Sequence, residues 1–99
     1  MGNLIKQAKQ MEQKINILKR ELASRELNIS SGGAIKITIN GKQEITDFKI
    51  DKSCLDTADT EMLQEMVKTA VNQAVRQSKE MVDNSMKKLT GGMGFPGLF

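Results

Sequence analysis

Histidine, tryptophan and tyrosine are absent from this sequence of 99 residues, so the side chains on which most enzymes rely are scarce. Without histidine the chain lacks the most common general base and metal ligand near neutral pH. The single cysteine, Cys54, cannot form an intrachain disulfide or a thiolate cluster, and no histidine can activate it as a nucleophile. We therefore expect a protein that is not an enzyme, with no catalytic residue, metal site, cofactor or small-molecule substrate.

Long apolar runs are also missing. No segment approaches the about 20 apolar residues that a transmembrane helix needs, and the first residues lack the apolar block of a signal peptide. These absences predict a soluble, cytoplasmic protein without membrane contact. The length suits one domain, and with three phenylalanines as the only aromatic residues its core is small. Dimerisation would add buried surface.

Charge is distributed unevenly along the chain, which has a net charge of +3. Residues 3–25 carry six cations and two acids, whereas residues 44–65 carry two cations and seven acids. Residues 76–90 are basic again, with four cations and two acids. This asymmetry indicates a polyanionic partner that meets only part of the molecule.

The first segment is predicted to be a long amphipathic helix that starts at Asn3, whose side chain can cap it. Its apolar residues recur at alternating steps of four and three: Leu4, Ala8, Met11, Ile15, Leu18 and Leu22. Such a heptad-like seam is narrow, so it suits packing against another helix better than packing under a sheet.

The next segment is typical of a small antiparallel sheet. Three stretches alternate apolar with polar residues and are predicted to be strands: residues 27–29, 34–39 and 43–50. Ser30–Gly33 forms a turn signal between the first two, and Asn40-Gly41 is a strong signal for a tight hairpin between the second and third. The strands therefore form a three-stranded meander.

The third strand contains an irregularity, because Ile45 is at an odd position whereas Phe48 and Ile50 are at even positions. Position parity decides which face of a strand a side chain occupies. A two-residue turn would leave Ile45 on the face opposite Phe48. A three-residue loop would set Ile45 opposite Ile37 and would need a bulge near Thr46-Asp47. We favour the second arrangement, because it places every large apolar residue under a helix.

Residues 51–58 are predicted to be a loop, and Thr57 or Asp59 can cap a second long helix. The apolar residues of this helix first come in adjacent pairs, from Met62-Leu63 to Ala74-Val75, and then narrow to a single seam. We expect its first half to cover the sheet and its second half to project and pair with the first helix. Whether the helix is continuous remains open. Residues 91–99 contain glycines, a proline and the apolar residues Phe95, Leu98 and Phe99, and are predicted to be a flexible tail.

Together these elements predict an α+β fold of order α-β-β-β-α, with residues 1–90 as one domain. The first helix carries a stripe without acids on the side opposite its seam: Lys6, Lys9, Gln13, Asn16 and Arg20. Such a stripe suits phosphate contact, although an ordinary solvated helix face has the same composition. The scarcity of aromatic residues argues against recognition of single strands by base stacking.

Several segments resemble the YbaB/EbfC family of bacterial nucleoid-associated proteins. They are "GNLIKQAKQMEQKI", the "NG" hairpin followed by "ITDFKID", "DTEMLQEMVKTAVNQA" and "TGGMGFPG". The resemblance implies a homodimer built across the small sheets, with helices of both subunits projecting as arms. It also implies binding of double-stranded DNA with low sequence specificity, in the bacterial cytoplasm and nucleoid, and a role in chromosome organisation.

The expected function is therefore a DNA-binding, nucleoid-associated homodimer, and the alternative is a helical-arm scaffold that binds other proteins without contacting DNA. Charge placement rather than a family motif selects the expected DNA contacts: Lys6, Lys9, Lys14, Lys19, Arg20, Arg76, Lys79, Lys87 and Lys88. The residues expected in the sheet of the dimer are Ile37, Ile39, Ile45, Phe48 and Ile50.

Overall fold

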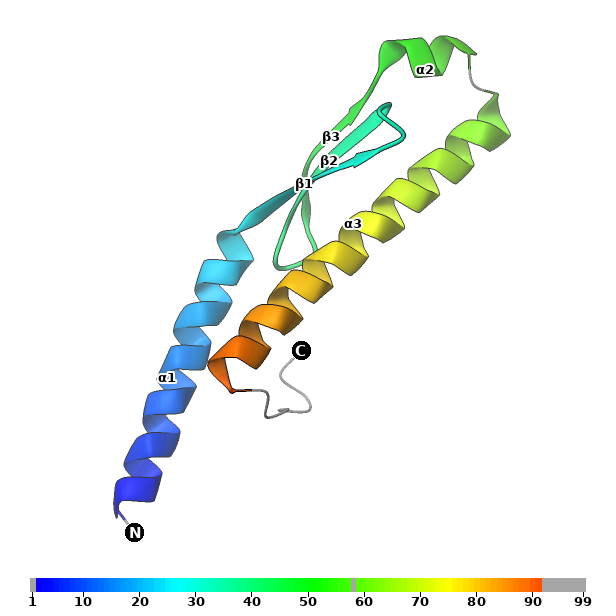
Figure 1. Cartoon of the computed structure of the whole chain (residues 1–99). Coiled ribbons are helices and arrows are strands. Elements are labelled where there is room, and N and C mark those ends of the chain that lie inside the picture. The colour runs from blue at the N-terminus through cyan, green and yellow to red at the C-terminus, as the bar shows by residue number, and fades with distance from the viewer. Residues whose placement is uncertain (1, 58, 92–99) are drawn as a thin grey trace.

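The computed structural model describes residues 2–57 and 59–91, which form an elongated body 67 Å long (Figure 1). Its elements in chain order are α1 (Gly2–Ser24), β1 (Glu26–Ser31), β2 (Ile35–Asn40), β3 (Ile45–Ile50), α2 (Lys52–Thr57) and α3 (Thr60–Leu89). The predicted α-β-β-β-α order is confirmed, with the short helix α2 in addition. The expected flexible tail falls largely on residues 92–99, which lie outside the described residues.

The three strands form one antiparallel sheet in the order β1-β2-β3. A bulge interrupts the pairing of β2 with β3, because Thr38 pairs with Asp47 whereas the adjacent Ile39 pairs with Ile45. Thr46 is therefore the extra residue, and the predicted bulge is confirmed. The predicted register was wrong, because Ile45 lies opposite Ile39 and not opposite Ile37.

The bulge resolves the change of parity in β3. Ile45, Phe48 and Ile50 pair with Ile39, Ile37 and Ile35, so all six isoleucine and phenylalanine side chains share the face that is turned toward α3. Three isoleucines of β2 are fully buried there, together with Ala70 and Ala74 of α3. The small alanines allow the helix to approach the central strand closely. The core of the protein is therefore the layer between β2 and the first half of α3.

Helix α3 lies over β1 and β2 and leaves β3 at the margin of the core. Ile45 and Phe48 consequently remain 40% and 38% exposed, although they share the apolar face of the sheet. Strand β3 is also an edge strand, so one row of its backbone hydrogen-bonding groups is not used within the sheet. One side of the sheet thus ends in an uncovered apolar margin.

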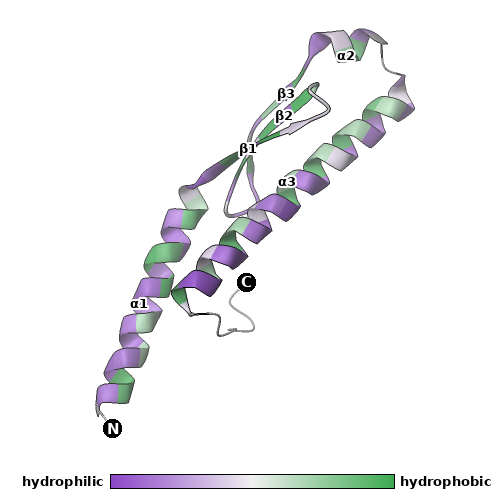
Figure 2. Ribbon diagram, in the orientation of Figure 1, coloured by the Kyte–Doolittle hydropathy of each residue, from purple (hydrophilic) through white to green (hydrophobic). Residues whose placement is uncertain are grey.

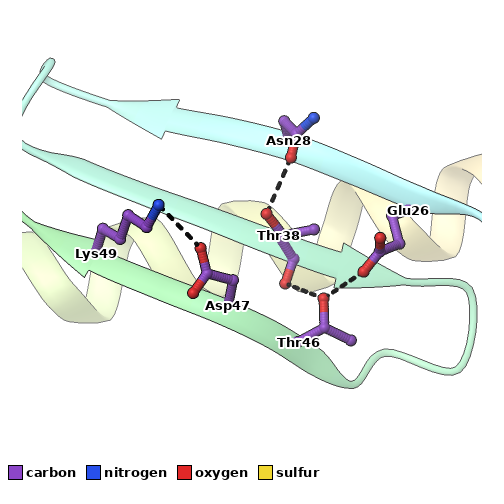
Figure 3. A network of polar contacts seen from close by, with 6 residues as sticks. All are labelled: Glu26, Asn28, Thr38, Thr46, Asp47 and Lys49. Atoms are coloured by element: carbon purple, nitrogen blue, oxygen red, sulfur yellow. Dashed lines mark hydrogen bonds and ion pairs between the residues drawn. The ribbon is translucent and has the colours of Figure 1, made fainter.

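The opposite face of the sheet is polar (Figure 3). The Thr46 hydroxyl donates a hydrogen bond of 2.6 Å to Glu26 Oε2, which links the two outer strands across β2. Thr38 Oγ1 donates to Asn28 Oδ1 at 2.9 Å, and Lys49 lies 3.7 Å from Asp47. The bulge directs Thr46 into this network while Ile45 stays on the apolar face.

Beyond the sheet, α1 and the second half of α3 pack side by side in opposite directions and form an arm (Figure 1). Ile15 and Leu22 of α1 are buried with Met86 of α3, and the remaining seam residues pack around them: Met11, Leu18, Met81, Val82 and Leu89. Both helices alternate apolar with hydrophilic bands (Figure 2). The two predicted roles of the halves of α3 are confirmed, and α3 is one continuous helix of 30 residues.

Two local expectations were wrong. Residues 52–57, predicted to be loop, form α2, because Asp51 begins a helical turn: its Oδ1 accepts from Ser53 N and its carbonyl oxygen accepts from Cys54 N. Asn3 does not cap α1, since the helix already includes Gly2. The cap of α3 is Asp59, one of the two expected residues, whose Oδ1 accepts from Met62 N at 2.7 Å. Among the described residues, no helix is long and apolar enough to cross a membrane.

Candidate nucleic-acid interface

The hairpin loop between β2 and β3 joins the arm to the sheet. Asn40 N donates to Glu44 O at 3.0 Å, which closes a loop of three residues, Gly41–Gln43. Gln43 has a φ of 62°, so the left-handed residue of this loop is not the glycine. Gly41 is required for another reason: its N–H donates to Leu22 O at 3.1 Å, and a Cβ added to it would lie 2.7 Å from Leu22 C and still closer to the carbonyl oxygen. The glycine thus permits backbone contact with the end of α1.

The same loop is fastened to α3 through Ser78, which is fully buried. The Ser78 hydroxyl donates to Asn40 O at 2.6 Å and accepts from Gln43 Nε2 at 3.1 Å. Gln43 Nε2 also donates to Gly41 O at 2.8 Å. Because one short loop contacts both helices, it sets the position of α1 relative to α3 at the base of the arm.

A cleft of about 640 Å³ opens at this junction, between the last turns of α1, the hairpin loop and the second half of α3. Four cations lie around it: Lys19 from α1, Lys42 from the loop, and Arg76 and Lys79 from α3. All four are exposed, and none forms an ion pair within residues 2–57 and 59–91. Positive charges from three separate segments that remain unpaired favour an anion in this place.

Two acids, Glu80 and Asp83, also line the cleft. Asp83 Oδ2 lies 3.3 Å from Lys87 Nζ, so its charge is already compensated by a neighbour on the same helix. Glu80 is the acid of the cleft for which the described residues provide no ion pair. The cleft therefore retains an excess of positive charge.

The nine cations predicted to contact DNA are all exposed, but they do not form one cluster. Lys19, Arg76 and Lys79 meet at the cleft. Lys6 and Lys9 belong to the first part of α1, which extends past the end of α3 (Figure 1), while Lys14 and Arg20 continue along α1 toward the cleft. Lys87 and Lys88 lie in the last turn of α3. The cations therefore follow the whole arm and converge at its base.

Lys42 is the residue that sequence reasoning missed. It follows the Asn40-Gly41 turn signal, and a turn residue is normally interpreted as solvated rather than functional. Its place at the cleft comes from the docking of the loop against α1, which depends on Gly41 and Leu22, distant in the sequence. A glycine beside a lysine in a hairpin is the only local signal, and it is weak.

Acidic residues gather at the other end of the molecule. Asp51 and Asp56 flank or belong to α2, and Asp59 and Glu61 lie at the start of α3, opposite the free end of α1 (Figure 1). The charge asymmetry of the sequence is therefore also an asymmetry in space. A polyanion is attracted to the arm and repelled from the α2 end.

A comparison with known protein families identifies the family of this chain. The model of the YbaB/EbfC DNA-binding family matches residues 1–93. The chain belongs to the YbaB/EbfC DNA-binding family.

Curated relatives that are 40–44% identical to this YbaB/EbfC chain are named nucleoid-associated proteins. One from Moorella thermoacetica is 44% identical over 101 residues, which cover 98% of this chain and 97% of that protein. Another, from Clostridium acetobutylicum, is 40% identical over 99 residues, covering 99% of this chain and 88% of that protein. Both alignments extend over the sheet and the arm.

The fold also matches a crystal structure, that of the uncharacterized protein HP0035 from Helicobacter pylori. The TM-score is 0.77 at 24% sequence identity, and the match covers 92% of this chain and 97% of that one. At this identity the likeness supports the fold alone. The arrangement of a helix, a three-stranded meander and a long second helix therefore also occurs in a crystal structure.

The residues expected in the dimer sheet of this YbaB/EbfC chain fall into two groups. Ile37 and Ile39 are buried beneath α3 within the single chain. Ile45 and Phe48 remain substantially exposed at the margin, and Ile50 is half-buried. The second group is therefore accessible at the surface, whereas the first is covered by α3.

Proposed function

We propose that this protein is a non-enzymatic, nucleoid-associated protein that binds double-stranded DNA through the phosphates. The observation that carries the proposal is the convergence of Lys19, Lys42, Arg76 and Lys79 at the base of an arm already lined by cations. Membership of a DNA-binding family and the names of the curated relatives support it. The corresponding place of action is the nucleoid of a bacterial cytoplasm.

The composition of the interface favours low sequence specificity. Seven of the nine predicted contact residues are lysines, which act on phosphates as flexible point charges rather than as bidentate partners of a base. Specific readout of a base pair needs fixed side chains that reach base edges in a groove. Exposed lysines along a helical arm instead supply affinity that is independent of sequence.

Two duplexes of equal length and unrelated sequence test this proposal directly. We expect their dissociation constants to agree within about threefold, because phosphate contacts do not differ between sequences. Fluorescence anisotropy with labelled duplexes measures both constants, and a single strand of one sequence serves as a comparison. A preference of more than about 100-fold for one duplex would contradict low specificity, since a single base pair contributes about 1–3 kcal/mol.

We also propose that the binding form is a homodimer that covers the margin of β3. Ile45 and Phe48 are apolar, exposed and adjacent to an unpaired strand edge, which is the combination that a second sheet can bury. The arms lie at the opposite end from α2, so a dimer formed through β3 leaves them projecting (Figure 1).

Phe48→Asp should therefore weaken the dimer about 30-fold, because a central aromatic contact is typically worth about 2 kcal/mol at an interface. Analytical ultracentrifugation over a range of protein concentrations measures the change. Lys36→Asp, on the polar face of the neighbouring strand, is the matched control and should leave the dimer unaffected. A dimer that survives Phe48→Asp unchanged would place the interface elsewhere.

A protein-interaction scaffold is the second candidate function, and one observation favours it. Leu4 and Ile5 at the free end of α1 are 70% and 61% exposed, more than any other large apolar side chain of the described residues. If the arm serves protein docking alone, the wild-type protein will not bind duplex DNA even at low salt. If DNA is the partner, Leu4→Gln with Ile5→Gln will retain duplex binding.

A further inference from the structure

The cleft at the base of the arm has an interior as well as a charged mouth. Its floor is lined by Ala23 and Val82, which are half-buried, and by Leu22 and Met86, which belong to the apolar layer between α1 and α3 and have almost no exposed surface. The cations at the mouth are exposed, and the accessible apolar surface of the floor comes mainly from Ala23 and Val82. The cleft therefore combines a positively charged rim with an apolar base.

Duplex DNA does not complement this combination. Its phosphates lie on the outside of a rigid, convex helix, so they can reach exposed lysines at the rim but bring no apolar group to the floor. The volume of about 640 Å³ falls within the range of about 300–1,000 Å³ that is typical of small-molecule sites. Contact with DNA at the rim thus leaves the interior without a matching ligand.

We propose that the cleft binds a small amphipathic anion, in which one phosphate, sulfonate or carboxylate group is attached to an apolar body. The anionic group matches the unpaired cations Lys19, Lys42, Arg76 and Lys79, and the apolar body matches the floor. Because the same cations are proposed to contact DNA, the anion competes with DNA for the arm. That competition rests on the DNA-binding function proposed above, but the binding of the anion does not.

A fluorescent aromatic sulfonate, 8-anilinonaphthalene-1-sulfonate, tests the site on the full-length protein without DNA. We expect one saturable site per chain in the cleft, detected by NMR as shifts of the Met86 and Val82 methyl signals. Inorganic sulfate at equal concentration should not displace the probe, because it lacks the apolar body. Shifts confined to Ile45, at the uncovered margin of β3, would overturn the proposal, as would equal displacement by sulfate.

A pair of charge variants tests the rim without disturbing the apolar layer. Lys42→Glu should weaken binding of the probe about fivefold, because it removes a cation from the mouth and adds a repulsive charge. Lys36→Glu makes the same change of charge on the outer face of the sheet and should alter binding less than about twofold. Equal effects of the two variants would overturn the proposed site, since only net charge would then matter.

Competition is measured last, by titrating the probe into a preformed complex with labelled duplex. Release of DNA at the concentrations that shift the Met86 methyl signal supports a shared site. Probe binding in the cleft without release of DNA overturns the competition and retains the site. If the protein binds the probe in the cleft but never binds duplex, the proposed function fails and the site stands.

Discussion

Replacing Arg76 and Lys79 together by glutamate is expected to weaken duplex binding about 100-fold at about 50 mM salt. Both side chains lie at the base of the arm, where charges from α1 and the hairpin loop reinforce them. Loss of one charge-assisted contact costs about 1.4 kcal/mol, or about tenfold in affinity, and each reversal adds repulsion from nearby phosphates. Anisotropy with a labelled duplex measures the change.

The matched control reverses two cations that lie away from the arm. Lys36→Glu with Lys52→Glu produces the same change of net charge on the polar face of β2 and in α2, away from the arm and outside β3. We expect less than about a fivefold effect, because screening limits interactions beyond about one Debye length. A similar loss of affinity in both double variants would mean that overall charge, and not the arm, governs binding.

Gly41→Ala is expected to destabilise the fold by about 3 kcal/mol, which lowers the melting temperature by about 15 °C. The new methyl group would meet the backbone of Leu22, and a backbone carbonyl cannot rotate away as a flexible side chain can. Relief requires the end of α1 to move from the loop, which also breaks the hydrogen bond from Gly41 N to Leu22 O. Thermal denaturation followed by circular dichroism measures the loss.

Gly2→Ala is the control for this variant. It makes the same chemical change at a helical glycine where a Cβ would meet no atom within 4 Å. Its melting temperature should remain within about 3 °C of the wild type. A wild-type melting temperature for Gly41→Ala would show that the loop does not hold α1 in the described position. The cleft between α1, the loop and α3 would then not have the described shape.

The helical part of the fold could be predicted from the sequence because it depends on local periodicity. The seam from Leu4 to Leu22 predicted a helix that packs on another helix, and Ile15 and Leu22 are indeed buried against α3. The paired apolar residues of α3 predicted a broad face, and Ala70 and Ala74 are buried against the sheet. Periodicity reports the burial of a helix face directly, so these predictions required no knowledge of the tertiary contacts.

The sheet could be predicted only in part. The parity change at Ile45 indicated a bulge, and the bulge at Thr46 is present. The register of β3 on β2 differs from the predicted one because Asn40 pairs with Glu44, which places Ile39 opposite Ile45. The Asn40 side-chain oxygen stabilises this loop by accepting from Lys42 N and Glu44 N. The tight hairpin that Asn40-Gly41 predicted is present, but Gln43 and not Gly41 occupies the left-handed region. Turn signals identify a hairpin more reliably than its exact geometry.

The site was the least predictable feature, because it is produced by tertiary docking. Lys19, Arg76 and Lys79 were chosen from charge placement, but nothing in their spacing shows that they meet. Lys42 joins them only because the loop contacts Leu22 and Ser78. A basic helix face is visible in a sequence, whereas the convergence of three segments depends on long-range backbone contacts.

The central claim, that the arm binds duplex DNA through phosphates, is tested most directly by a salt titration of wild-type binding. If about five phosphates are neutralised, log affinity should fall linearly with log salt concentration at a slope near about −4.5. In the Arg76→Glu, Lys79→Glu variant the slope should become less negative by about two, since two contacts are lost. Duplex affinity that does not change with salt would contradict the account.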